Sequence, residues 1–232
     1  MGIARGPKIV TSGLVLALDA ANKLSYPGSG TTWTDLSGNG NNGTLTNGPT
    51  YSSANMGSIV FDGIDDYVNC GSNSSLNLGS LTLSAWVKAS TNVSTYRAII
   101  ADESITGAST WNYRLYIVQS SGLVTFDVSG GGYSGVSSTY AINNNQWYHI
   151  CAVRTSPGGT QNLYINGILN NSGSDTTSIT TLSYAVWIGR SPFGGGVYPF
   201  IGNISQVSIY NRSLTAAEIL QNYNATKSRF GR

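Results

Sequence analysis

The chain has 232 residues, of which 9% are charged and 40% are hydrophobic, and its formal net charge is +2. This length suits one β-sandwich, the apolar fraction is too high for a disordered chain, and the charge is too small to indicate a nucleic-acid partner. The 29 glycines, with many Asn, Ser and Thr residues, separate short apolar runs, as is typical of strands joined by tight turns.

Strand-like runs follow one another along most of the chain. Residues 81–88 alternate clearly, with Leu81, Leu83, Ala85 and Val87 on one side. Residues 33–48 are rich in Gly, Asn and Thr and predict an irregular loop. The predicted strands are residues 14–19, 59–61, 67–70, 81–88, 97–101, 113–118, 123–128, 147–154, 162–165, 186–189 and 201–210, with another strand-like region around Leu169.

One short helix is predicted near the end of the chain. Thr215 and Glu218 have the spacing of a capping box, in which each side chain accepts a hydrogen bond from the other residue's backbone. Many strands with one late helix exclude a helical bundle and a Rossmann fold. The sequence therefore predicts an all-β protein, a two-sheet antiparallel jelly-roll sandwich with one short C-terminal helix.

Catalytic residues are scarce. Of the two glutamates, Glu218 belongs to the capping box, and Glu103 adjoins Asp102 at the end of a predicted strand. Neighbouring residues of a strand point to opposite faces, so this pair does not predict the facing carboxylates of a glycoside hydrolase. The one histidine, His149, lies inside an apolar strand and is interpreted as structural. The sequence predicts that the protein is not an enzyme.

Three aspartates lie close together in the turn after residue 61. Asp62, Asp65 and Asp66 offer the hard oxygen ligands that Ca²⁺ prefers, so this turn is a candidate calcium site. The alternative is turn chemistry, in which the carboxylates accept backbone N–H bonds. No other cofactor is predicted.

Sugar binding requires exposed aromatic rings beside amide and hydroxyl groups, and three predicted loop regions offer them. The alternative is that these aromatic residues close the ends of the core or face a partner subunit. Trp86 and Trp147 are assigned to the scaffold instead. The candidate glycan-binding residues are Trp111, Asn112, Tyr113, Tyr133, Phe193 and Tyr198.

Basic residues collect at the two ends. Residues 1–12 are predicted to be an N-terminal arm, residues 13–224 the sandwich, and residues 225–232 a basic C-terminal arm. Either the arms contact neighbouring molecules or they are solvated polar termini. The basic residues of these arms are Arg5, Lys8, Lys227, Arg229 and Arg232.

The chain shows no apolar stretch of a secretory signal and no window apolar enough to span a membrane. We therefore expect synthesis in the cytoplasm without a signal peptide, and no membrane insertion. In that compartment Cys70 and Cys151 are expected to be reduced thiols.

Five segments together resemble the laminin-G-like, concanavalin A-like lectin domains, over a region from about Leu14 to Tyr223. They are Phe-Asp-Gly-Ile-Asp-Asp-Tyr-Val at 61–68, Leu-Ser-Ala-Trp-Val-Lys at 83–88, Trp-Tyr-His-Ile-Cys-Ala-Val-Arg at 147–154, Leu-Tyr-Ile-Asn-Gly at 163–167, and residues 201–219. The resemblance implies a concanavalin A-like sandwich that recognises ligands. It also implies one structural Ca²⁺, although Ser205 and Gln206 stand where the family often has an acidic residue.

Residues 13–22 and 218–231 are similar to the laminin-G-like proteins of tailed bacteriophages. This resemblance implies a virion structural protein, in a capsid decoration or a tail fibre, located on the virion surface. Its partners would be other virion proteins or copies of itself, with adhesion to host-surface glycans. The alternatives are a free carbohydrate-binding adhesion module of a bacterium and a cement protein without a ligand.

Overall fold

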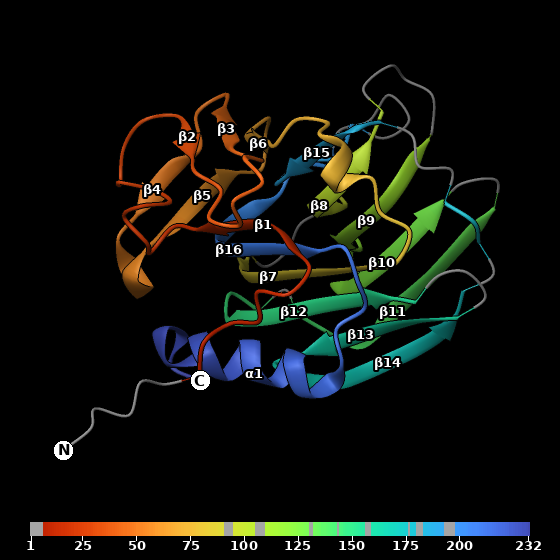
Figure 1. The fold of residues 1–232 in the computed structure, drawn as a ribbon. Coiled ribbons are helices and arrows are strands. Elements are labelled where there is room, and N and C mark those ends of the chain that lie inside the picture. Colours follow the sequence, from red (N-terminus) through yellow and green to blue (C-terminus); the bar gives the residue numbers. More distant parts are fainter. Residues whose placement is uncertain are drawn as a thin grey trace.

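The protein is a sandwich of two eight-stranded antiparallel sheets with one α-helix along the outside (Figure 1). This computed structural model describes residues 7–90, 95–104, 110–129, 132–142, 144–155, 159–175, 177–179, 183–192 and 198–232. The predicted all-β fold class, with two antiparallel sheets and a short C-terminal helix, is confirmed.

Sheet A contains the strands that lie nearest to the helix. Its order is β14-β13-β12-β7-β16-β5-β4, and β1 pairs with β16 beside β5. The long β16 therefore joins three neighbours, which fixes the middle of the sheet. The bounds are β14 Ile168–Ser174, β13 Thr160–Ile165, β12 Trp147–Arg154, β7 Leu81–Ala89, β16 Ile201–Tyr210, β5 Ser58–Asp62, β4 Thr50–Ser52 and β1 Leu14–Asp19.

Sheet B forms the other layer of the sandwich. Its order is β11-β10-β9-β8-β15-β6-β3-β2. The bounds are β11 Tyr133–Ala141, β10 Leu123–Ser129, β9 Trp111–Ile117, β8 Arg97–Glu103, β15 Ala185–Ile188, β6 Tyr67–Asn69, β3 Gly43–Thr46 and β2 Thr32–Trp33.

The main core fills the space between the sheets, as strand alternation requires. In β7 the residues Leu81, Leu83, Ala85 and Val87 belong to this core, as the sequence predicts. In β9 the corresponding residues are Tyr113, Leu115 and Ile117. The intervening residues of each strand therefore belong to the outer face of its sheet.

Helix α1, Ala216–Thr226, covers part of the outer face of sheet A (Figure 1). Its predicted capping box is confirmed, since Thr215 Oγ1 accepts the N–H of Glu218 and the Glu218 carboxylate accepts the N–H of Thr215. Ile219 of the helix packs in a second apolar cluster with Cys151 and Tyr164 of sheet A. Docking stabilises a helix that is too short to persist alone.

Four strands were not predicted from the sequence. The predicted loop 33–48 contains β3, and β2 ends at its first residue. Strands β4 and β11 also lie in stretches rich in Gly, Ser and Thr, where the apolar alternation is weak. They pair along the margins of the sheets, where backbone hydrogen bonds to a neighbouring strand replace the hydrophobic pattern. Short 3₁₀ turns occur at Ala54–Met56 and Ser74–Leu76.

The C-terminal segment packs against the protein's own sheet A, which differs from an arm that reaches for neighbours. After α1 a 3₁₀ turn, Lys227–Phe230, inserts the Phe230 ring against Trp86, with ring centroids 4.0 Å apart. Arg229 forms an ion pair with Asp19, with 2.8 Å between Nη2 and Oδ1. Arg232 Nη2 donates to the Trp147 carbonyl. The driving force is the burial of aromatic surface, which the charge pattern of residues 225–232 does not reveal.

The N-terminal segment lies along the same side of the molecule. The carbonyl of Lys8 accepts a hydrogen bond from Gln221 of α1, and the N–H of Val10 donates to Asn222. Arg5 lies outside the described residues. Cys70 and Cys151 are free and buried. None of the helices in the described part of the chain is long and apolar enough to cross a membrane.

Candidate functional site on the outer face of sheet B

A hollow of about 140 Å³ lies on the outer face of sheet B. In β9, Arg114 and Tyr116 alternate with the core residues Tyr113 and Leu115, so their side chains leave the sheet on the outer side. We call this hollow the tyrosine hollow. Its lining residues are Tyr96, Ala98, Arg114, Tyr116, Ser191 and Tyr198.

Three tyrosine rings form the wall of the tyrosine hollow. The ring centroid of Tyr96 is 5.8 Å from that of Tyr116 and 4.9 Å from that of Tyr198. These three side chains come from the segment before β8, from β9 and from the segment before β16. Segments far apart in the sequence therefore contribute to one aromatic surface.

Arg114, at the base of the tyrosine hollow, is held from two directions. Its Nε and Nη2 atoms donate to the two carboxylate oxygens of Asp127 in β10, at 3.0 and 2.9 Å. Its guanidinium carbon lies 3.6 Å from the ring centroid of Trp111. Alternation alone would point Trp111 to the side of Tyr113. A bulge in the β8–β9 pairing next to Glu103 breaks that alternation and accompanies the contact of Trp111 with Arg114.

The buried ion pair changes the acidity of both partners. Burial raises the pKa of Asp127, against the hydrogen bonds and charge of Arg114 that lower it. For Arg114, burial lowers the pKa, but the hydrogen bonds and charge of Asp127 outweigh it, so the pKa is raised. The Arg114 guanidinium is therefore protonated and held in place, and the carboxylate of Asp127 on the same face balances its charge.

A second hollow, of about 430 Å³, adjoins the ends of β8 and β15. We call it the tryptophan hollow, because Trp187 of β15 lines it together with Tyr184 and Glu103. The Trp187 ring is supported by Tyr67 of β6, with centroids 4.8 Å apart. The other lining residues are Asn69, Ser72, Ser104, Ser183 and Ala185.

Glu103 and Asp102 differ in their surroundings although they are adjacent. Glu103 accepts a short hydrogen bond from the hydroxyl of Ser191. Burial raises the pKa of Glu103 to about 7. Asp102 accepts a hydrogen bond from Asn112 Nδ2 at 3.0 Å, and burial raises its pKa to about 8.

The outer face of sheet B brings two carboxyl groups into one region, which calls for a test of catalysis. The charge of Asp127 acts on Glu103 and contributes to its raised pKa. Both oxygens of Asp127 are occupied by Arg114, however, and its side chain is fully buried. A glycosidase needs a second carboxylate that can reach the sugar or a water molecule. Asp127 is therefore not available as that second carboxylate.

The six predicted glycan-binding residues fall into three groups. Tyr198 lines the tyrosine hollow and Trp111 supports its base. Asn112 and Tyr113 are 1% and 0% exposed, so they are corrected to structural residues: Asn112 bonds to Asp102, and the Tyr113 hydroxyl donates to the Leu76 carbonyl.

Two predicted residues give no side-chain contact to report. Tyr133 begins β11, contrary to its prediction as an open loop, and its side chain is not described. Phe193 lies outside the described residues. The sequence analysis missed the remaining lining residues of the tyrosine hollow. Alternation in β9 could have revealed Tyr116 and Arg114, but nothing in the local sequence indicates Tyr96 and Ser191.

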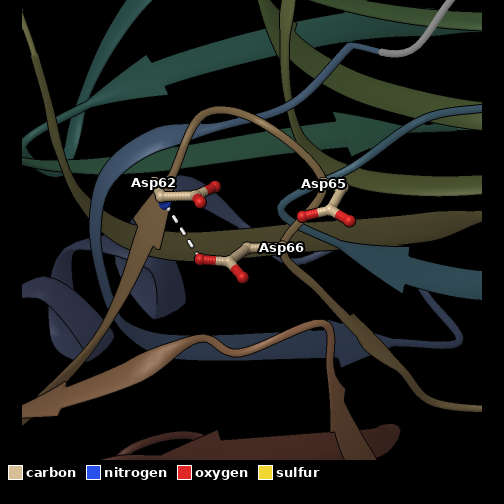
Figure 2. Close-up of side chains that lie close together, drawn as sticks. All are labelled: Asp62, Asp65 and Asp66. Carbon is tan, nitrogen blue, oxygen red and sulfur yellow. Dashed lines mark hydrogen bonds between the residues drawn. The ribbon is translucent and has the colours of Figure 1, made fainter.

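The turn between β5 and β6 brings the three predicted calcium ligands together, as Figure 2 shows. One oxygen from each of Asp62, Asp65 and Asp66 lies within 4.8 Å of the other two. Asp66 Oδ2 accepts the N–H of Asp62 at 3.0 Å, and Asp62 Oδ1 accepts the N–H of Ile64 at 2.8 Å. These carboxylate oxygens suit a hard cation such as Ca²⁺. Two of them also accept backbone N–H groups of the turn, which is the alternative role of these residues.

Two of the remaining interpretations are confirmed. His149 is a buried structural residue, 3% exposed, whose Nε2 lies 2.9 Å from Ser84 Oγ. Burial lowers its pKa to about 4, so the ring is neutral at physiological pH. Trp86 and Trp147 are buried scaffold residues, 1% and 8% exposed.

Solved structures with the same fold include binding domains of bacterial toxins. The binding domain of Paraclostridial Mosquitocidal Protein 1 has a TM-score of 0.70 and 16% identity, over 92% of this chain and 52% of that one. The receptor binding domain of botulinum neurotoxin C/D mosaic serotype has a TM-score of 0.70 and 17% identity, over 92% and 51%. The binding domain of botulinum neurotoxin DC in complex with SialylT has a TM-score of 0.67 and 16% identity, over 93% and 52%.

The chain therefore spans about half the length of these structures, and at such identity the likeness shows the fold alone. No curated protein matches the sequence. The profile of the Laminin_G_3 family, described as the Concanavalin A-like lectin/glucanases superfamily, matches residues 62–220. That segment includes strands of both sheets and most of the outer face of sheet B. The chain belongs to the Laminin_G_3 family of the concanavalin A-like lectin and glucanase superfamily.

Proposed function

We propose that this protein recognises glycans through the outer face of sheet B and does not cleave them. The observation that carries the proposal is the tyrosine hollow, which combines three aromatic rings with the guanidinium of Arg114 and the hydroxyl of Ser191. Sugars present C–H faces that pack on rings and hydroxyl groups that need polar partners. Binding pockets for small molecules have this composition, a mainly apolar wall with a few fixed polar groups.

The rigidity of the site also supports recognition. Arg114 is fixed by two hydrogen bonds and by the Trp111 ring before any ligand arrives. A side chain that is already ordered loses little conformational entropy on binding. The occupied Asp127 carboxylate argues against cleavage, as described above.

A glycan array tests the proposal. We expect the wild-type protein to bind a subset of glycans, and Tyr116→Ala and Tyr198→Ala to weaken that binding roughly tenfold, since each removes one aromatic wall. The control is Tyr140→Ala on β11, because Tyr140 is 46% exposed and lies outside the hollow. Absence of binding by the folded wild-type protein, or equal binding by all variants, would contradict glycan recognition at this face.

We also propose that the protein lies on the surface of a virion, in a capsid decoration or a tail fibre. The similarity of residues 13–22 and 218–231 to laminin-G-like proteins of tailed bacteriophages supports it. Lys8 and Arg232, near the two limits of the described chain, both lie on the side of sheet A, which agrees with attachment there and display of sheet B. Locating the chain in purified particles by electron microscopy tests it, and particles that lack the protein overturn it.

The same two experiments separate the alternatives. A protein that is present in particles and binds no glycan is a cement protein. A protein that binds glycans and is absent from particles is a free adhesion module. The first result overturns glycan recognition and supports location on a virion, and the second result does the reverse.

A further inference from the structure

The tyrosine hollow and the tryptophan hollow meet at one hydrogen bond. Ser191 lines the first hollow, Glu103 lines the second, and the Ser191 hydroxyl donates to the Glu103 carboxylate. The two hollows are thus neighbouring parts of one outer face. Each offers aromatic rings, from Tyr116 on one side of this bond and from Trp187 on the other.

One oxygen of Glu103 is left without a partner at this junction. Glu103 is 1% exposed, and its Oε2 atom accepts the Ser191 bond. In the part of the chain that the structure describes, its Oε1 atom has no hydrogen-bond partner. A buried carboxylate oxygen without a partner is costly, so such an atom points to a group that is supplied from outside.

We propose, building on the function above, that the ligand of this face is a neutral oligosaccharide of at least two sugar residues that occupies both hollows and donates a hydroxyl hydrogen bond to Glu103 at their junction. One sugar packs on the tyrosine rings and the next lies beside Trp187. The Glu103 carboxylate accepts the Ser191 hydroxyl on one oxygen and the ligand hydroxyl on the other.

The charges around Glu103 favour a neutral sugar over an anionic one. The groups whose charges act on it are Asp102 of its own strand, Arg114 of β9, Asp127 of β10 and, from the segment before β16, Tyr198. Arg114 is the one cation among these described groups, and Asp127 already neutralises it. Arg190, the residue before Ser191, is a further described cation, and its guanidinium carbon lies 5.2 Å from the ring centroid of Tyr67, which packs on Trp187. A carboxylate or phosphate placed beside Glu103 itself would meet a like charge and a guanidinium that Asp127 already neutralises.

The same surroundings set the direction of the pH dependence. Burial raises the pKa of Glu103 to about 7, so the carboxyl changes its charge in the neutral range. A ligand hydroxyl bonds more strongly to the ionised carboxylate than to the neutral acid. Since Glu103 is already 1% exposed, covering it adds little further desolvation. Binding therefore strengthens as the pH rises through about 7.

The test uses neutral gluco-, galacto- and manno-oligosaccharides of one to six residues, with sialyllactose as the anionic probe. Calorimetric Kd values are measured at pH 6 and pH 8 for the full chain, Glu103→Gln and the control Tyr140→Ala. We expect Kd to fall at least roughly tenfold from the monosaccharide to the longer probes, and about fivefold from pH 6 to pH 8. Glu103→Gln is expected to lose the pH effect while its thermal unfolding stays cooperative.

The outcomes distinguish this inference from the proposed function. Tight binding that does not depend on probe length, preference for sialyllactose, or an unchanged pH effect in Glu103→Gln overturns the inference and leaves glycan recognition intact. No binding of any probe, together with no binding on the glycan array, overturns both. A folded Trp187→Phe variant that loses affinity for the longer probes alone supports the second hollow independently of Glu103.

Discussion

The outer faces of the two sheets carry similar aromatic residues but differ in what covers them. On sheet A, Trp86 and Trp147 are covered by Phe230, whose ring centroid lies 4.0 and 4.8 Å from theirs. On sheet B, the tyrosines around Arg114 border a hollow of about 140 Å³. The protein's own C-terminal segment covers the aromatic residues of sheet A, whereas the described tyrosines of sheet B border a hollow.

On the proposed function, this difference separates a structural surface from a recognition surface. Aromatic residues contribute to stability where the chain itself buries them, and they can contribute to binding where they border a hollow. Composition cannot make this distinction, because both faces combine Trp or Tyr with Arg and Asp.

The two faces contain equivalent arginine–aspartate pairs in different surroundings. Arg114→Ala is expected to lower the free energy of unfolding by about 3–5 kcal/mol, because it leaves the Asp127 carboxylate buried without an opposite charge. Arg229→Ala on sheet A is the matched variant, with an expected loss of about 1 kcal/mol, because the pair with Asp19 is partly exposed. Urea denaturation of both variants measures the difference, and equal losses would show that burial is not what distinguishes the faces.

Phe230→Ala is expected to lower the free energy of unfolding by about 3 kcal/mol, because it empties the space between Trp86 and Trp147. Glycan binding of the folded variant should equal that of the wild type, because Phe230 packs against the outer face of sheet A and the tyrosine hollow is on sheet B. Thermal denaturation and the glycan array measure the two effects. A marked loss of glycan binding at a temperature where the variant is folded would refute the assignment of separate roles.

His149, under the C-terminal segment, should make stability depend on pH. Its pKa is about 4 in the folded protein against an ordinary value of 6.5, so the unfolded chain takes up a proton that the folded chain does not. Stability from this residue is complete above pH 6.5 and is lost as the pH falls toward 4, with about 2 kcal/mol lost at pH 5. Comparing the denaturation of wild type and His149→Phe at pH 5 and pH 8 isolates this contribution.

The turn between β5 and β6 joins the two sheets and should show the smallest effect. If Asp62, Asp65 and Asp66 bind Ca²⁺ with a millimolar Kd, 5 mM Ca²⁺ adds about 1 kcal/mol of stability. Asp65→Asn should abolish that gain without disturbing the hydrogen bonds that Asp62 and Asp66 make within the turn. A Tm that is the same with Ca²⁺ and with EDTA would leave turn chemistry as the role of these residues.

Much of the fold could be predicted because the central strands carry a strong signal. Strands Leu14–Asp19, Trp147–Arg154 and Ile201–Tyr210 were predicted with the bounds that the structure gives. Many of their residues face a core and are therefore apolar, so the hydrophobic pattern of the sequence reveals where these strands lie. The marginal strands β3 and β11 were missed, because they are rich in Gly, Ser and Thr and lack a strong hydrophobic alternation. Backbone pairing with neighbouring strands holds them in place.

The candidate site was harder to predict for a different reason. Their positions just before and at the start of a predicted strand suggested exposure for Asn112 and Tyr113, but both lie within β9 and are buried. The site instead depends on Tyr96, Tyr116 and Ser191, which lie far apart in the sequence and become neighbours only through strand order. Reading the full alternation of β9 would have recovered Tyr116, while Ser191 requires the three-dimensional pairing of β8 with β15.

The neighbouring positions of the two ends have a practical consequence. Lys8 bonds to α1, and Arg232 bonds to Trp147, so both extremities of the described chain lie on the side of sheet A. A tether joined close to Lys8 or Arg232, whether a surface, a label or a fused protein, would be attached on the side away from sheet B. On the proposed function, immobilising the protein at these two positions should therefore preserve its glycan binding, whereas random coupling should not.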